Sequence, residues 1–368
     1  MPATRAQIAD FFADSPTRWR EQTAANDTAR VDWSLGSTWR RFVFVLVTTA
    51  ILPNLVAARA EELRRVRIQE NTEVQFATVE QGKERLQQAD RFLESLSRFD
   101  LECRLQTNEP TTAAQVGALA AGEVRAWSSM EIETISAMFN AIRERLAPYR
   151  LPLPKTIWLV KTSGREEGEA AYCRGNTIIL PQRMLDPRST RLERTLVHEL
   201  FHVLSNQNPA LRNELYSLVG FHPCPPVTMP KTLADRKITN PDAPTLDAFI
   251  RLDLSGESVA AVPLLFASVE RYNPSEGGSF FKYLTFRLLV IEQEGETWRA
   301  SQRDGQPRLL DPAQVDSYHA QIGKNTRYII HPEEVLADNF VHLIFATPDL
   351  PTPDLIARLK QRLQSPTR

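Results

Sequence analysis

The sequence predicts a protein of the α+β class, and three observations support this prediction. Two β-rich runs, 155–161 (KTIWLVK) and 170–181 (AAYCRGNTIILP), precede an amphipathic helical pattern at 190–207. Further β-rich runs lie between about 245 and 308, and helical patterns close the chain. Strands and helices that occur in separate runs are typical of α+β folds.

The composition is that of a globular protein without a global charge bias. The chain has 368 residues, a formal net charge of -1 and 42% hydrophobic residues. It can therefore bury a sizeable core, and its charge gives no reason to expect nucleic acid as a partner. The cysteines, Cys103, Cys173 and Cys224, allow at most one disulfide within a monomer, so we expect no disulfide framework. Free thiols and one bridge both remain open.

Residues 37–60 have the layout of a secretory signal peptide. Arg40 and Arg41 precede an apolar run at 42–57, which is followed by Ala58-Arg59-Ala60. This order of a basic region, an apolar region and a small-x-small site is that of a cleaved signal. The run is shorter than the ~20 apolar residues that a spanning helix needs, which favours cleavage after Ala60.

We therefore expect an exported protein, periplasmic or secreted, that begins at Glu61 and keeps no stable membrane anchor. An uncleaved anchor and a buried core helix are the alternatives. Residues 1–36 form a polar extension that is long for a signal peptide. We expect it to be disordered or to lie upstream of the true start codon.

Residues 61–125 are predicted as a helical N-terminal region, since 79–99 combines helical apolar spacing with many charged residues. The main domain, 126–347, opens with a second helix of the same kind at 127–149. The two β-rich runs then form a strand pair that leads into the helix at 190–207.

The stretch from 220 to 244 is rich in proline, which predicts an irregular surface segment and a candidate wall of a cleft. The β-rich runs at about 245–308 predict a small antiparallel insertion within the main domain. A helix at 331–345 follows, closed by Pro348, and residues 348–368 carry a short amphipathic C-terminal helix.

The helix at 190–207 contains the motif HELFH. Thr190 and Glu193 fit a capping box at its start. His198 and His202 are four residues apart, so they lie one turn apart on one face, with Glu199 beside them. Two imidazoles at this spacing can bind one tetrahedral cation while Glu199 points to a water, which is the physical content of an HExxH motif. A helix with two incidental histidines is the alternative.

A catalytic zinc site needs a third protein ligand. The extended metzincin pattern has a Gly three residues and a His six residues after the second histidine of the motif, but these positions hold Ser205 and Asn208, which excludes it. Glu214 could return to the site on a following helix. A solvated Glu214 beside Arg212 is the interpretation that we prefer.

A stronger candidate for the third ligand lies in the helix at 331–345. Pro332 suits position N1, and Glu334 and Asp338 are four apart on one face. Two acids on an inward face need a partner, and a metal-bound carboxylate with a second carboxylate that holds a ligand histidine supplies one. Glu333 should then face away and act on the helix N-terminus by its charge. An acidic first turn without a ligand role is the alternative.

The motifs HELFH and EVLAD together resemble the gluzincins, a clan of zinc metallopeptidases in which HExxH is completed by a Glu in a downstream Glu-x-x-x-Asp/Glu helix. The resemblance implies a zincin-like core, a small sheet with an active-site helix, and Zn²⁺ bound by His198, His202 and Glu334. It further implies Glu199 as general base and Asp338 as the residue that orients a ligand histidine. The long separation between the two helices makes the β-rich stretch an insertion.

The resemblance also implies a peptide or protein substrate. The run 170–181 is similar to the edge strand of such enzymes, whose backbone pairs with an extended peptide; an ordinary hairpin strand is the alternative. Tyr328 resembles a tyrosine that some gluzincins place before the third-ligand helix, where it stabilises the oxyanion. His222, Tyr318 and His319 are rival candidates for this role.

These features together predict an exported zinc-dependent hydrolase, a peptidase in the interpretation that we prefer. Glu199 would take a proton from the attacking water and pass it to the leaving nitrogen. Two alternatives stay open. One is a catalytically inactive binding or scaffold protein of the same fold, which would not need Glu199. The other is a zinc amidase that acts on cell-wall peptides and shares the site chemistry.

Overall fold

The computed structural model describes residues 64–186 and 190–365 and shows a mixed α+β fold, which confirms the predicted class. The predicted signal peptide at 37–60, the polar extension at 1–36 and the start at Glu61 lie outside the described residues. Within the described ranges, no helix combines the length and the apolar character that crossing a bilayer requires.

The first sheet combines strands from both sides of the predicted boundary at 125. Its strands follow the order β1 (Arg65–Gln69), β2 (Thr72–Phe76), β4 (Thr156–Thr162), β6 (Thr177–Pro181) and β5 (Tyr172–Arg174), and β3 (Val124–Arg125) pairs with the end of β4. β2, β4 and β6 are parallel, whereas β1 and β5 run antiparallel to their neighbours. The 170–181 run is thus two strands, with β5 at the edge of the sheet.

The β1–β2 hairpin corrects the prediction of a helical N-terminal region, which is wrong for 65–76. Val66 and Ile68 on β1 and Val74 and Phe76 on β2 are buried and alternate with more exposed residues, the pattern of half-buried strands. A two-stranded hairpin is marginal alone, and this one is stabilised because β2 pairs with the distant β4.

Short helices follow the hairpin: α3 (Val79–Gln87), α4 (Arg91–Glu94), α5 (Arg98–Arg104) and α6 (Ala113–Gly122). The sequence pattern at 79–99 suggested one continuous helix. Asp90 and Ser97 divide it, because each side chain accepts a hydrogen bond from a backbone N–H three residues later and so starts a new helix.

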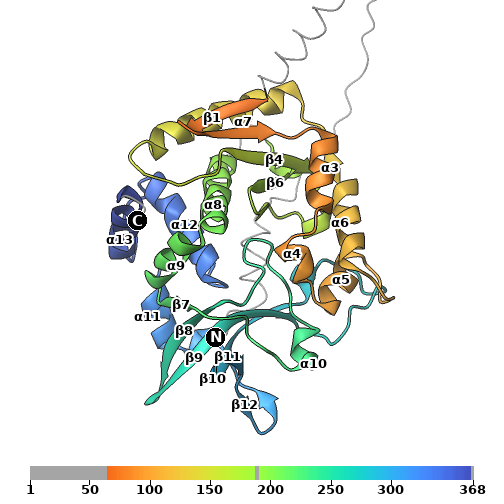
Figure 1. Ribbon diagram of the computed structural model, residues 1–368, viewed down its shortest axis with the longest axis vertical. Helices are drawn as coiled ribbons and strands as arrows, with labels where there is room; N and C mark the ends of the chain where they lie inside the picture. Colours follow the sequence, from red (N-terminus) through yellow and green to blue (C-terminus); the bar gives the residue numbers. More distant parts are fainter. Residues whose placement is uncertain (1–63, 187–189, 366–368) are drawn as a thin grey trace, which may run out of the picture.

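Helices cover both faces of the first sheet. Ile157 and Leu159 on β4 belong to the main core together with α7 (Ser129–Leu146) and α8 (Thr190–Gln207). Trp158 and Val160 point to the other face, towards α3 and α6. This division follows from the two-residue period of a strand. In Figure 1, α8 lies between the first sheet and the second sheet.

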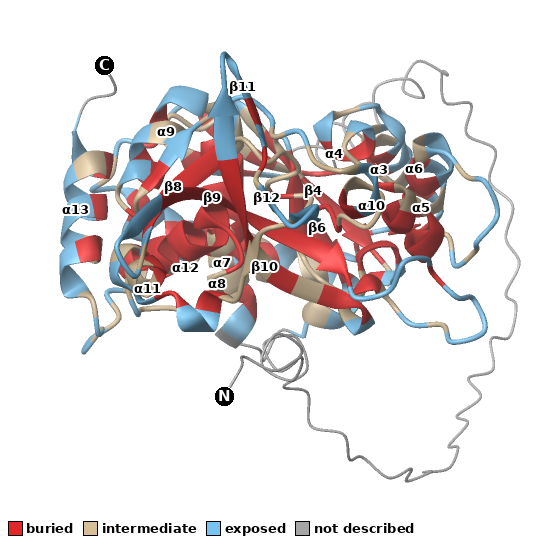
Figure 2. Cartoon of the chain, turned by 90° about the horizontal axis from the view of Figure 1, so that it is seen from below, coloured by how far each residue is buried: buried red, intermediate tan, exposed pale blue. Residues whose placement is uncertain are grey.

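The second sheet confirms the predicted antiparallel strands between about 245 and 308. Its strands follow the order β11 (Thr297–Ala300), β10 (Leu284–Glu294), β9 (Glu257–Ala267), β8 (Ala248–Leu254) and β7 (Phe221–Pro223), and β14 (Leu309–Leu310) pairs with β10. A small hairpin, β12 (Gln302–Arg303) and β13 (Gln306–Pro307), stands beside it. Buried residues concentrate in the strands of both sheets and in the helices between them (Figure 2).

The remaining elements are helical: α9 (Pro209–Ser217), α10 (Lys231–Ala234), α11 (Asp316–Ile322), α12 (Pro332–Ile344), α13 (Pro353–Gln364), and the 3-10 helices η1 (Arg165–Glu167), η2 (Gln182–Met184), η3 (Phe280–Lys282) and η4 (Pro312–Gln314). Nearly every residue of α12 is buried, and α12 packs along α8. α13 turns Leu355, Leu359 and Leu363 towards the core, which confirms the predicted amphipathic helix.

Candidate metal centre

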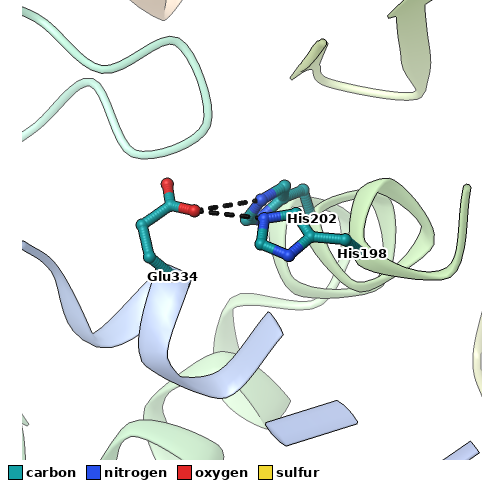
Figure 3. Close-up of side chains that lie close together, drawn as sticks. All are labelled: His198, His202 and Glu334. Atoms are coloured by element: carbon teal, nitrogen blue, oxygen red, sulfur yellow. Dashed lines mark hydrogen bonds and ion pairs between the residues drawn. The ribbon is translucent and has the colours of Figure 1, made fainter. Parts of the chain in front are cut away.

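Two helices bring the predicted ligands together. His198 and His202 lie on α8, and Glu334 lies in the first turn of α12. Oε2 of Glu334 lies 3.2 Å from Nε2 of His198 and 3.6 Å from Nε2 of His202 (Figure 3). One ligand atom from each of the three residues lies within 4.8 Å of the others, close enough to share one metal ion.

Local sequence explains how α12 presents its acids. Pro332 stands at the start of the helix, as predicted, and His331 is the N-cap residue, whose Nδ1 accepts a hydrogen bond from the backbone N–H of Glu333 at 3.2 Å. The side chain of Thr190, which belongs to the predicted capping box of α8, lies outside the described residues.

A carboxylate holds the outer nitrogen of each ligand histidine. Nδ1 of His198 lies 3.1 Å from Oδ1 of Asp338, as predicted, and the Thr326 hydroxyl donates to the other oxygen of Asp338. Nδ1 of His202 lies 3.0 Å from Oε1 of Glu333. Each contact favours a proton on Nδ1 and directs Nε2 to the shared ligand position.

The expectation that Glu333 faces away from the site is wrong. Glu333 is buried, and its Oε2 accepts hydrogen bonds of 2.7 Å from both the Ser205 and the Tyr216 hydroxyls. The prediction assumed that α12 has a solvent face beside its acidic face. Because α8 and α9 enclose the first turn of α12, adjacent acids that point in different directions both meet buried partners.

The donor set fits a metal ion. Two imidazole nitrogens and one carboxylate oxygen match the ligand number and type of a catalytic zinc site. Nε2 of His202 is buried and makes no hydrogen bond with any described residue, so in the tautomer with the proton on Nδ1 its lone pair lacks a partner, which a cation could supply.

The pKa shifts in the cluster follow from its burial and its charges. Burial lowers the pKa of His198, but its hydrogen bonds with Asp338 and Glu334 outweigh burial and raise the pKa to about 10. Burial also acts to lower the pKa of His202, but the charges of Asp242 and Glu334 outweigh burial, so the pKa of His202 lies well above its usual range. Protons on the imidazoles thus balance the buried carboxylates, and a bound cation can replace that positive charge.

Glu199 lies beside the candidate ligands, and it lines the same cavity as His198 and Glu334. It is only 3% exposed, and its Oε2 has no hydrogen-bond partner among the described residues. Burial raises the pKa of Glu199, which makes the ionised carboxylate a stronger base.

Two site residues were not identified from the sequence, Asn240 and Asp242. Nδ2 of Asn240 donates to Oε1 of Glu334 at 2.5 Å, which leaves Oε2 for the histidines. Asp242 is buried, and one of its carboxylate oxygens lies within 4.8 Å of a carboxylate oxygen of Glu199 and a ring nitrogen of His202. These three residues form a second group that could hold a cation. The sequence feature that points to these two residues is the proline-rich stretch 220–244, which is predicted as a cleft wall.

The candidates for the oxyanion role separate clearly. The Tyr328 ring stacks on that of His198, with 6.4 Å between centroids and 26° between planes, and Tyr328 lines the cavity. The Tyr318 hydroxyl is used within the core, where it donates to the carbonyl oxygen of Ile329 at 2.6 Å. His319 contacts the carbonyl of Pro312, and His222 is exposed on β7.

Glu214 does not join the cluster. It is half exposed on α9 and forms an ion pair with Arg362 of α13. The cysteines are also separate from one another: Cys103, Cys173 and Cys224 are free thiols in the described part of the chain.

A cavity of about 980 Å³ opens above the ligands. Its walls come from Glu169–Tyr172 beside the edge strand, the first half of α8, the segment Ile238–Asp242, the stretch 325–328 and α12. Leu265 on β9 and Leu284 on β10 of the second sheet add apolar side chains to the lining. The cavity is therefore large enough for a short peptide.

Comparisons with protein-family models, with curated proteins and with solved structures found no match. What the site can do follows from its geometry and chemistry.

Proposed function

We propose that this protein is a zinc-dependent hydrolase of peptide bonds, with a zincin-like core of the gluzincin type. The observation that carries the proposal is the convergence of His198, His202 and Glu334, together with a buried carboxylate on Nδ1 of each histidine. Histidines oriented in this way are typical of metal sites, since the outer contact fixes the tautomer. An incidental histidine pair has no need of two such carboxylates.

Glu199 is the proposed general base. A zinc ion bound by the three ligands would act as a Lewis acid that acidifies water and polarises the scissile carbonyl. Glu199 accepts the proton of the attacking water and donates it to the leaving nitrogen. Its buried Oε2, without a hydrogen-bond partner among the described residues, is available for this proton.

Tyr328 is the proposed donor to the oxyanion. Its ring is fixed against His198 at the cavity wall, and its hydroxyl can donate a hydrogen bond to a carbonyl oxygen that gains negative charge. Burial raises the pKa of Tyr328, so the phenol keeps its proton over the range in which Glu199 works as a base.

The edge strand β5 supplies a place for the substrate backbone. Arg174 and Thr177 close the turn between β5 and β6, so by antiparallel alternation Tyr172 bonds towards β6 while Ala171 and Cys173 point outward. Ala171 lines the cavity, and a peptide can extend the sheet there by backbone hydrogen bonds.

Metal analysis and hydrolysis of wild type and Glu199→Gln test the proposal. Wild type should bind about one zinc and cleave unblocked short peptides. Glu199→Gln keeps the ligands and the shape of the site, so zinc should remain while kcat falls by several orders of magnitude. A protein that binds zinc but cleaves no peptide would be a binding protein, and a protein without zinc affinity would contradict the metal site itself.

A further inference from the structure

Along α8 and α12, the cavity extends from the candidate metal centre in one direction. In the described part of the chain, the lining residues of α8 run from Arg191 to Glu199, and those of α12 run from Glu334 to His342. On the other side of the ligands, the interior is filled by the hydrogen-bonded group of Glu333, Ser205 and Tyr216. A substrate can therefore extend from the scissile bond in one direction.

Asp242 occupies the outer edge of β5 close to the candidate metal centre. Its Oδ1 accepts a 2.6 Å hydrogen bond from the outward-facing backbone N–H of Cys173. Next to it, Ala171 and Tyr172 line the cavity, whereas Cys173 and Arg174 of the same strand do not. A peptide that pairs with Ala171 would meet the Asp242 carboxylate where its chain would otherwise continue.

The segment that carries Asp242 is firmly anchored. Thr239 donates to the Asp100 carboxylate from its backbone N–H at 3.1 Å and from its hydroxyl at 2.6 Å. Arg104 donates to the Thr239 carbonyl at 3.2 Å and to Asp100 at 2.5 Å, and all these groups are buried. Burial of this hydrogen-bonded ionic group makes the segment a fixed wall rather than a mobile lid.

Acidic side chains gather around Asp242. Glu199 and Asp242 both line the cavity there, and the Glu199 Oε2 atom is buried without a hydrogen-bond partner among the described residues. The α-amino group of a peptide is cationic, so its charge matches these two acids.

We propose that the site takes peptides by their free N-terminus, with Asp242 binding the α-ammonium group, and therefore acts as an aminopeptidase. This proposal rests on the proposed peptide hydrolysis. Water adds across the first peptide bond, so one free amino acid and a peptide shortened by one residue are released.

The short reach from Asp242 to Glu199 sets the bond that is cut. One carboxylate oxygen of Asp242 lies within 4.8 Å of a carboxylate oxygen of Glu199. The α-nitrogen and the carbonyl carbon of one residue are separated by roughly 2.5 Å. An amine on Asp242 thus places the carbonyl of the first residue beside Glu199, and later peptide bonds lie farther along the cavity.

The test uses a pentapeptide with free ends, its N-acetylated twin and its C-amidated twin. Wild type loaded with zinc is assayed for hydrolysis, with products identified by mass spectrometry. Binding of the same peptides to zinc-loaded Glu199→Gln is measured by calorimetry, which needs no turnover. Asp242→Asn is made in both backgrounds. Glu169→Gln, an acid-to-amide change at another lining residue, which pairs with Arg183, is the matched control.

We expect wild type to release the N-terminal residue of the free and the amidated peptides, and to cleave the acetylated twin at least 100-fold more slowly in kcat/KM. Acetylation should weaken binding to Glu199→Gln at least tenfold. Asp242→Asn should remove this preference, mainly through KM, while its zinc content stays unchanged. Glu169→Gln should keep the preference.

Equal cleavage of the acetylated twin, cleavage at internal bonds, or faster hydrolysis by Asp242→Asn would overturn the inference and leave the proposed hydrolase intact. Faster hydrolysis would mean that Asp242 blocks the site. Absence of all hydrolysis, together with amine-dependent binding, would instead overturn the proposed function and keep Asp242 as an amine-binding residue. The comparison of the twins on wild type needs no substitution, so it decides the matter even if Asp242→Asn does not fold.

Discussion

Oε1 of Glu333 lies 3.0 Å from Nδ1 of His202, in a part of the core where both side chains are almost fully buried. This contact repeats the relation between Asp338 and His198, so both histidines of the motif are held by carboxylates from one helix. α12 therefore supplies the candidate ligand Glu334 and the two carboxylates that contact the histidines, all within its first two turns.

Glu333→Gln should weaken zinc binding by about 10 to 100-fold, the usual cost of losing a residue that orients a metal ligand. The amide keeps the size of the side chain but removes the charge that favours a proton on Nδ1 of His202. Titration with zinc against a chromophoric chelator measures the effect. Asp354→Asn, which changes an exposed first-turn acid of α13, is the control and should bind zinc as wild type does. Equal affinities in both variants would mean that Glu333 has only a packing role.

His202→Ala and Glu334→Ala should each abolish stoichiometric zinc binding, because each removes one of the three proposed ligands. Glu214→Ala should leave zinc content unchanged, since Glu214 pairs with Arg362 away from the cluster. Metal analysis of the three purified variants decides between them. Loss of zinc from Glu214→Ala with retention in Glu334→Ala would show that the third ligand is misassigned.

Asn240→Ala should lower zinc affinity, because Oε1 of Glu334 loses the 2.5 Å hydrogen bond that leaves Oε2 to the ligand position. The expected cost is again about 10 to 100-fold. Asn240→Asp is the sharper variant. It keeps the size of the side chain but replaces the donor with a second carboxylate, so zinc-free protein should be less stable than Asn240→Ala in urea unfolding. The opposite order of stability would argue against a direct contact with Glu334.

Glu166 should make the protein less stable as pH rises. Burial raises its pKa to about 7 from the usual value of 4.5, although Thr162 donates to its Oε1 at 2.5 Å. Between pH 4.5 and about pH 7, Glu166 holds a proton in the folded state that it has lost in the unfolded state. The contribution of Glu166 to stability is therefore complete at low pH and declines through this window.

Glu166→Gln stays uncharged and should remove that decline. Its free energy of unfolding should exceed that of wild type by roughly 2 to 3 kcal/mol near pH 8 and should match it near pH 4. Urea unfolding of both proteins at several pH values measures the difference. A difference that is constant with pH would contradict a raised pKa for Glu166.

Much of the site could be predicted from short stretches of sequence. His198 and His202 share a face because an α-helix has 3.6 residues per turn, and the same geometry relates Glu334 to Asp338. The β-rich runs at 155–161 and 170–181 also became strands, since β-branched residues bounded by Gly and Pro favour them locally.

The structure departs from the prediction where an element depends on a distant partner. Strands β1 and β2 carry short, partly charged alternating patterns, and pairing with β4 stabilises them. The direction of Glu333 depends on the packing of α12 against both α8 and α9. A local pattern can assign a residue to a helix, but it cannot show that the helix lacks a solvent face.

By itself, the sequence determined which residues are candidates: an HExxH helix, an acidic helix and a proline-rich wall. The tertiary structure decided how they meet, because Glu334 follows His198 by 136 residues and Asn240 precedes Glu334 by 94. Contacts over such separations arise from burial of the whole core and from loop closure, which no local spacing encodes. For this reason Asn240 and Asp242, in a stretch without regular periodicity, became visible as site residues only in the folded chain.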